Sequence, residues 1–179
     1  MKIKDVIDKL SSYNLYNYLL PGFVFVMILS KTTSLLPGDL AFDFINIVLI
    51  YFTGLVISRI GSLIIEGILT KRLNIGEIDT SILIKKLKSN VKFEVIFEVM
   101  NMYRTIAAML FLLSLMTLLD LTLHHYTWLI SLLTAIVEVL LATLFTFAYC
   151  KQRNKVLQCL PEYDKIKETL FKKVKKRTE

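Results

Sequence analysis

The long, mostly apolar stretch Ala41–Leu69 constrains the fold of this chain more than any other feature. A membrane crossing needs about 20 apolar residues, and at 1.5 Å rise per residue this stretch forms a helix about 43 Å long. It therefore predicts a helix that crosses a bilayer and continues beyond it. Gly54, Ser58 and Ser62 recur at every fourth position, and small residues with this spacing form a groove that another helix can approach closely.

The composition also indicates a membrane protein. Of the 179 residues, 55% are hydrophobic, and the mean hydropathy is +0.58. The apolar residues come in blocks separated by polar segments, which is the pattern of membrane spans joined by loops. The sequence thus predicts an all-α fold: an integral membrane four-helix bundle with a long second helix that extends into the cytoplasm, and with short cytosolic helices.

The blocks divide the chain into four predicted segments. They are residues 1–70, an N-terminal interfacial helix and a transmembrane hairpin with spans at about 19–35 and 41–69; residues 71–104, a cytoplasmic helical loop; residues 105–150, a second hairpin with spans at about 105–123 and 127–149; and residues 151–179, a basic cytoplasmic C-terminal helix.

The amphipathic start, Met1–Ser12, either lies on the membrane or docks a partner. It lacks a signal-peptide pattern, so we expect the first span to remain in the protein. A helix over Lys92–Arg104 is predicted to continue into the third span, and a short strand at Phe93–Phe97 is the weaker alternative.

Positive charge is concentrated in three parts of the chain. Of the 22 Lys and Arg residues, three lie in residues 1–10, seven in residues 71–104 and ten in residues 151–179. The remaining loops carry almost no Lys or Arg. The positive-inside rule then places both termini and the 71–104 loop in the cytoplasm, giving a multi-pass protein with N-in and C-in topology.

The sequence shows no motif for catalysis or cofactor binding. It contains no nucleotide-binding loop, no catalytic-triad spacing and no H-E-x-x-H. His124 and His125 with Asp120 would make at most a weak metal site, and a polar outer loop explains them better. Cys150 and Cys159 are expected to be ordinary thiols. We therefore expect a protein that is not an enzyme and that binds no cofactor and no metal.

The charged residues inside the spans are more informative. Glu138 falls near the middle of the fourth span, where a charge costs about 2.5–3.5 kcal/mol to insert. Arg59 and Glu66 lie seven residues apart, on about the same face of the second span. Three interpretations stay open: Arg59 pairs with Glu138 or Glu66 and fixes the bundle or its oligomer; Glu138 lines a pore between chains; or Glu138 is a proton-coupling carboxylate of a transporter.

Two cytoplasmic clusters of positive charge are candidate docking surfaces for lipid or for a partner. They comprise Lys85, Lys86 and Lys88 in the loop, and Lys172, Lys173, Lys175, Lys176 and Arg177 near the C-terminus. Clustered Lys and Arg beside a membrane attract anionic lipid at about 1 kcal/mol per residue. Nucleic acid and an acidic cytosolic protein are the alternatives, and the absence of interleaved aromatic residues disfavours direct nucleic-acid binding.

One stretch carries a family resemblance. Residues 13–23 read YNLYNYLLPGF and enter the first span, and the long second span follows with Gly54 and Arg59-x-Gly61. This layout resembles the membrane subunit of Kiwa-type anti-phage defence systems, which are small bacterial four-span proteins. The resemblance implies an inner-membrane sensor that oligomerises, and a separately encoded cytosolic partner that acts on phage DNA. It also implies that residues 71–104 and the C-terminal helix are the docking surfaces.

Together these observations and the resemblance predict a bacterial inner-membrane sensor or scaffold that oligomerises and recruits a cytosolic effector in anti-phage defence. Membrane lipids, further copies of the chain and a separately encoded cytosolic protein are its expected partners. The alternative is a small oligomeric ion channel or pore-forming effector.

Overall fold

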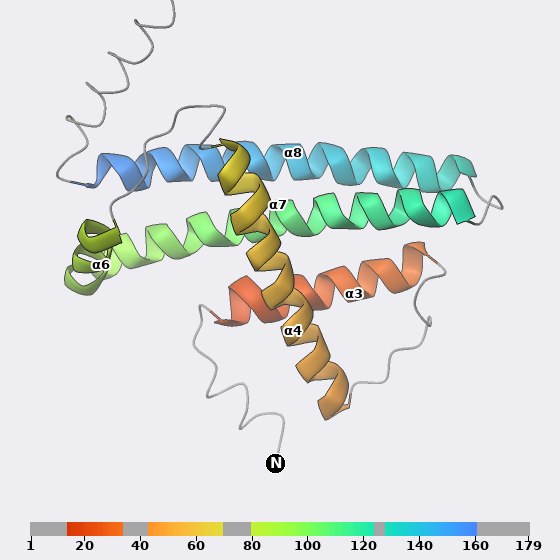
Figure 1. Cartoon of the computed structure of the whole chain (residues 1–179), viewed down its shortest axis with the longest axis horizontal. Helices are drawn as coiled ribbons and strands as arrows, with labels where there is room; N and C mark the ends of the chain where they lie inside the picture. The colour runs from red at the N-terminus through yellow and green to blue at the C-terminus, as the bar shows by residue number, and fades with distance from the viewer. Residues whose placement is uncertain (1–13, 34–42, 70–79, 124–127, 161–179) are drawn as a thin grey trace, which may run out of the picture.

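The computed structural model contains helices and no strands over the residues that it describes, which are 14–33, 43–69, 80–123 and 128–160 (Figure 1). The helices are η1 (Leu15–Leu19), α3 (Leu20–Thr32), α4 (Phe44–Gly61), η2 (Ser62–Glu66), α6 (Thr80–Ser89), α7 (Val91–Leu123) and α8 (Trp128–Gln158), where η marks a π-helix. The expected interfacial helix at Met1–Ser12 and the C-terminal helix lie outside the described residues.

Four of these helical stretches are long and apolar enough to cross a membrane. They are Leu15–Thr32, Phe44–Leu69, Val91–Thr122 and Trp128–Gln158, with 18, 26, 32 and 31 residues. The predicted all-α fold with four candidate spans is therefore confirmed. The strand alternative at Phe93–Phe97 is wrong, because this segment is part of α7.

The long antiparallel pair of α7 and α8 forms the body of the molecule (Figure 1). Most side chains that α8 buries in the apolar part of this seam are small, namely Ser131, Ala135 and Ala142, with Glu138 between them. Small residues let two helix backbones approach closely, which is how helices attract one another in lipid. Asn90 caps the start of α7, because its side-chain Oδ1 accepts a hydrogen bond from the Phe93 backbone N–H at 3.2 Å.

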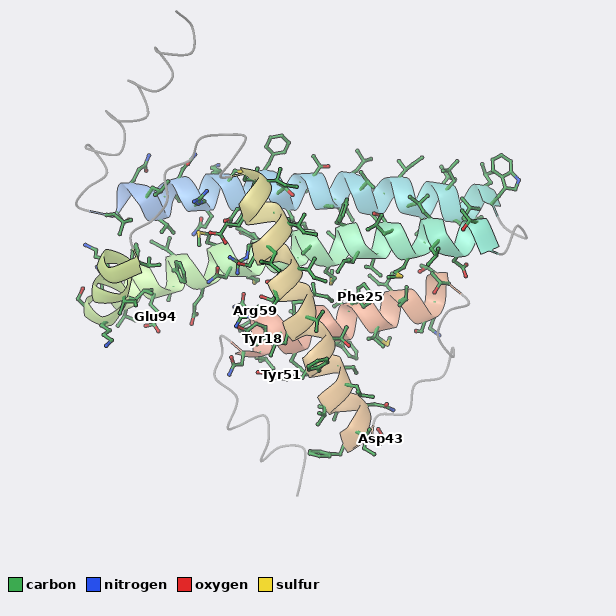
Figure 2. The ribbon with its side chains drawn as sticks, viewed as in Figure 1. Tyr18, Phe25, Asp43, Tyr51, Arg59 and Glu94 are labelled. Carbon is green, nitrogen blue, oxygen red and sulfur yellow. The ribbon has the colours of Figure 1, made fainter. Side chains whose placement is uncertain are left out.

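α3 lies beside α7, and α4 crosses both obliquely (Figure 1). At the crossing of α3 and α4 the two backbones touch at Gly22 and Gly54. A Cβ on Gly54 would fall on the backbone oxygen of Tyr18, and one on Gly22 would lie 2.8 Å from the Gly54 nitrogen. The rings of Tyr18 and Tyr51 meet edge to face beside the crossing, with centroids 5.9 Å apart (Figure 2). Only glycine fits at either position.

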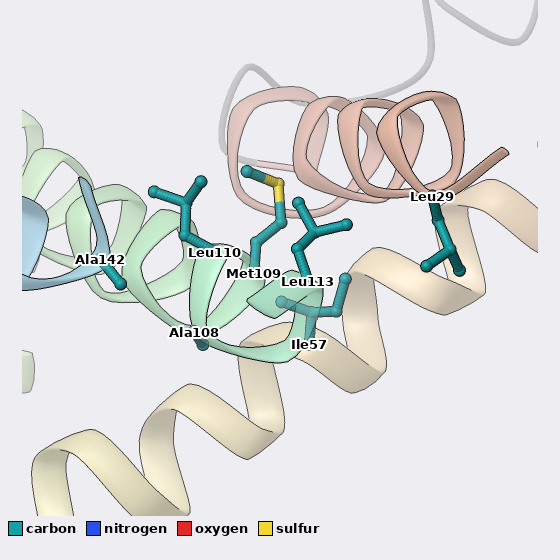
Figure 3. Packing of buried hydrophobic residues seen from close by; sticks show 7 residues of the cluster. All are labelled: Leu29, Ile57, Ala108, Met109, Leu110, Leu113 and Ala142. Atoms are coloured by element: carbon teal, nitrogen blue, oxygen red, sulfur yellow. The ribbon is translucent and has the colours of Figure 1, made fainter. Parts of the chain in front are cut away.

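The same two long helices contribute to two separate hydrophobic cores. The first, which we call the membrane core, joins α3, α4, α7 and α8 through Leu29, Ile57, Ala108, Met109, Leu110, Leu113 and Ala142 (Figure 3). The second, which we call the stem core, comprises Phe93, Met100, Tyr149, Val156, Leu157 and Leu160, with Leu83 and Leu87 of α6 packed against it. We use "stem" for α6 together with residues 91–103 of α7 and 150–160 of α8.

Candidate functional site

Four polar side chains from three segments of the chain gather where the membrane core gives way to the stem core. Glu66 comes from the end of η2, Arg104 from α7, and Tyr149 and Arg153 from α8; we call this group the polar belt. Tyr149 is buried in the stem core, and Ile65 and Tyr103, the chain neighbours of Glu66 and Arg104, pack against that core. The belt is therefore a single site assembled by tertiary packing.

The belt contains an ion pair that joins η2 to α7. The Arg104 Nη1 donates to the Glu66 Oε2 at 2.7 Å, and the two side chains are 12% and 33% exposed. Within the described part of one chain, Glu66 pairs with Arg104 and not with Arg59. The reason is geometric: α4 crosses α7 at Gly61, where an added Cβ would lie 3.0 Å from the Ala108 Cβ and 3.2 Å from the Arg104 oxygen. Arg59 instead lies exposed on the surface of α4 (Figure 2).

Tyr149 and Arg153 are the most deeply buried members of the belt. Tyr149 is 0% exposed and Arg153 is 2% exposed. In the part of the chain that the structure describes, the Tyr149 hydroxyl and the Arg104 Nε are buried without a hydrogen-bond partner. Buried polar groups are nearly always hydrogen-bonded, so these two donors are exceptions to the usual pattern.

Glu138 forms a second polar contact, inside the membrane part of the α7–α8 seam. The Thr117 hydroxyl donates to the Glu138 Oε2 at 3.2 Å, and Glu138 is 5% exposed. One chain thus encloses this carboxyl group between its own two helices. A pore lined by Glu138 from several chains would require the side chain to leave this position, so the geometry favours a structural role between helices.

The Thr117–Glu138 contact gives a testable prediction. In a double-mutant cycle with Thr117→Val and Glu138→Met, we expect a coupling energy of about 0.6 kcal/mol and at most about 1.7, the range for hydrogen bonds between membrane helices. Unfolding in mixed micelles measures it. Thr122→Val is the matched control, because Thr122 is exposed and, among the described residues, its hydroxyl donates to the Leu119 carbonyl of its own helix. A cycle with Thr122 that couples as strongly would contradict the assignment.

The small residues of the second span take different positions. Gly54 lies at the α3 crossing, and the Ser58 Oγ accepts a hydrogen bond from the Thr105 hydroxyl of α7 at 3.2 Å. Ser62 is half-buried at the start of η2. Gly61, which was not among the predicted packing residues, is the position where α4 meets α7. One helix therefore approaches α4 at Gly54, and a different helix approaches it at Ser58 and Gly61.

The other predicted site residues divide between the described and undescribed parts of the chain. Lys85, Lys86 and Lys88 lie on α6, with Lys86 half-buried and Lys88 exposed. Cys150 and Cys159 are free thiols. Asp120 is buried on α7. His124 and His125, and Lys172, Lys173, Lys175, Lys176 and Arg177, lie outside the described residues.

Three belt residues were missed by sequence reasoning, namely Arg104, Tyr149 and Arg153. A signal for one pair was available. In a hairpin that turns near residues 124–127, positions equally far from the turn lie opposite each other, and Arg104 and Tyr149 nearly meet this condition. The contribution of Glu66 was not accessible in this way, because it depends on where α4 crosses α7.

No family model, curated protein or solved structure matches the chain. The resemblance to Kiwa membrane subunits remains a prediction from the sequence.

Proposed function

We propose that this protein is a non-enzymatic sensor or scaffold of the bacterial inner membrane that oligomerises and recruits a cytosolic effector to its stem. The observation that carries the proposal is the length of the α7–α8 pair. A bilayer crossing needs about 20 residues, whereas α7 has 33 residues and α8 has 31. The excess length stays paired around the stem core, so it offers a rigid, preformed surface on which a partner loses little ordering entropy.

The surface of the stem combines exposed apolar and basic side chains. Ile84, Val91 and Val95 are 48%, 76% and 52% exposed, and Lys88 and Lys92 are exposed near them in the sequence. Apolar side chains rimmed by charge, on a part of the molecule outside lipid, are typical of protein–protein contact sites. This chemistry fits an acidic cytosolic protein with apolar anchor residues.

The charge distribution supports a cytoplasmic stem. The positive-inside rule applied to the Lys- and Arg-rich segments at residues 1–10, 71–104 and 151–179 gives N-in and C-in topology. The resemblance to Kiwa membrane subunits agrees with this arrangement. It supports a role in anti-phage defence with a separately encoded partner.

The surface of α4 supports assembly into an oligomer. Arg59 is exposed on α4, where Val56 is also exposed at 39%, and Leu63 of the following η2 is 78% exposed. An arginine facing hydrocarbon is costly, and a neighbouring chain relieves that cost. The channel alternative receives less support, because Glu138, the carboxyl group near the middle of a span, is enclosed within one chain.

Recruitment is tested by co-purification with the protein encoded beside this gene. Neutralising Lys86→Gln and Lys88→Gln on α6 should weaken capture by about tenfold, because each surface charge pair contributes up to about 1 kcal/mol. Lys31→Gln is the matched control, an exposed lysine in the last turn of α3 that should leave capture unchanged. The proposal would be overturned if the variant with Lys86→Gln and Lys88→Gln captured the neighbouring protein as well as Lys31→Gln does, and if deleting either gene left phage sensitivity unchanged.

A further inference from the structure

One side of the stem carries two valines and two glutamates that the described helices leave largely open. Val91, Glu94, Val95 and Glu98 fall within about 100° of one another around α7, because each residue turns a helix by about 100°. Val91 and Val95 are 76% and 52% exposed, Glu94 is exposed and Glu98 is half-buried. We call these four residues the acidic stripe. It combines apolar and negatively charged side chains on a part of the molecule outside lipid.

Both carboxylates of the described stem lie on the acidic stripe. Within residues 80–89, 91–103 and 150–160, Glu94 and Glu98 are the acidic residues, and neither forms an ion pair with a described side chain. Like charges four positions apart destabilise a helix, and a cation beside them offsets the repulsion. The stripe therefore favours an occupant that combines apolar side chains with positive charge.

Nearer the bilayer, the same side of α7 is already covered by another helix. The buried Thr105 lies on this side, and its hydroxyl donates to the Ser58 Oγ of α4 at 3.2 Å. The exposure of Val91 and Val95 shows that this cover does not extend to the start of α7. A further helix along the acidic stripe would continue the packing that α4 begins, and it would remove two exposed valines from water.

The chain itself continues from the end of the stem at which the stripe begins. α8 ends beside the start of α7 (Figure 1), and Leu160 and Phe93 belong to the same stem core. The 19 residues from 161 to 179 therefore start at the same end of the stem as Val91. As a helix they would be about 28 Å long, against about 11 Å from Val91 to Glu98, so they can return along the whole stripe.

The sequence of this segment matches the acidic stripe in its chemistry. Residues 161–179 contain seven Lys and Arg residues and four Asp and Glu residues. Their apolar residues recur with helical spacing, and Lys167 and Lys173 stand three positions before and after Leu170. The apolar positions are Tyr163, Ile166, Leu170 and Val174. A helix with this pattern presents an apolar strip flanked by positive charge, which complements the stripe.

We infer that residues 161–179 pack as an amphipathic helix along the acidic stripe of their own chain. Their lysines lie beside Glu94 and Glu98, and their apolar side chains cover Val91 and Val95. The segment thereby occupies part of the surface offered to the effector, so the two compete for the stem. That competition rests on the proposed function, whereas the contact within the chain does not.

The test follows the reaction of Val95→Cys with a maleimide in the full-length protein, held in phosphatidylcholine nanodiscs with no partner present. Peptide mass spectrometry measures each cysteine separately, so Cys150 and Cys159 stay in place. Adding Lys167→Glu with Lys173→Glu should raise the rate at position 95 about tenfold, because two reversed charges repel the stripe and release the segment.

Lys175→Glu with Lys176→Glu is the matched control for these charge reversals. It makes the same change in net charge on the opposite side of the expected helix, so the rate at Val95→Cys should stay unchanged. Asn154→Cys, at an exposed position of α8, should react equally fast with either pair of lysine variants. Equal rates at Val95→Cys with both pairs would overturn the inference, because the segment would then not cover the stripe.

Two further measurements identify the contact and its source. Glu94→Lys with Glu98→Lys should also release the segment, and combining it with Lys167→Glu and Lys173→Glu should slow the reaction at position 95 again. Failure of this charge exchange to restore the cover would count against the inference. Under mild oxidation, Val95→Cys and Ile166→Cys should form a disulfide within one chain. A disulfide that joins two chains instead would assign the stripe to a second copy and overturn the contact within the chain.

Discussion

Replacing Gly54 by alanine should destabilise the protein by about 3 kcal/mol, the upper end for overpacking a tight contact. The new Cβ would fall on the Tyr18 backbone oxygen and lie 2.7 Å from its carbonyl carbon. Backbone atoms of a helix cannot rotate away as a side chain does, so α3 and α4 must separate. The prediction is checked by chemical unfolding in detergent micelles and by the elution profile of the extracted protein.

Gly67→Ala is the matched control for this substitution. It is the same chemical change, later in the same apolar stretch, at a site where the added Cβ meets no described atom within 4 Å. It should leave stability unchanged or raise it by about 0.5–1 kcal/mol, because alanine favours the helix. If Gly54→Ala behaves like Gly67→Ala, the close crossing of α3 and α4 is wrong.

Phe93→Ala should unfold the stem and leave the membrane part of the protein folded. Phe93 is 2% exposed and belongs to the stem core, where truncating a buried phenylalanine costs about 3–5 kcal/mol. The buried residues of the two cores do not overlap, although the half-buried Ile65 packs against both, so the chain should still insert and be extracted normally. We expect effector capture to be lost and hydrogen exchange to rise in α6 and at the start of α7.

Val91→Ala provides the comparison, since Val91 is 76% exposed and lies only two residues away. It should leave exchange in the stem unchanged, although it can weaken capture if the partner contacts this side chain. If the stem of the Phe93→Ala variant is unfolded and the variant still captures the effector normally, the stem is not the docking surface.

The four spans are predictable because lipid imposes a strict length and composition on each of them. The continuation of α7 upstream of Arg104 is also predictable, since its polar residues keep a helical pattern. The α8 helix runs to Gln158, past the predicted end of the span at Tyr149, because Lys151, Gln152 and Arg153 favour helix as well as water.

The site is less predictable because spacing identifies a groove but not its occupant. Gly54, Ser58 and Ser62 indicate that a helix approaches, yet α3 approaches at the first and α7 at the second. Similarly, Glu66 needs a cation, and choosing Arg104 over Arg59 requires the crossing of α4 and α7. These choices depend on tertiary packing, which leaves no periodic pattern in the sequence.

Both cores contain residues of the same uninterrupted helix, α7. The angle about the helix axis between the side that faces the membrane core and the side that faces the stem core is therefore fixed. Each residue turns a helix by about 100°, so a single insertion between Met100 and Ala108 would swing the stem to another side of the molecule. Only a change of about seven residues, made in both arms of the hairpin, would restore the alignment. The distance from bilayer to docking surface can therefore vary among related proteins only in coarse steps of about 10 Å.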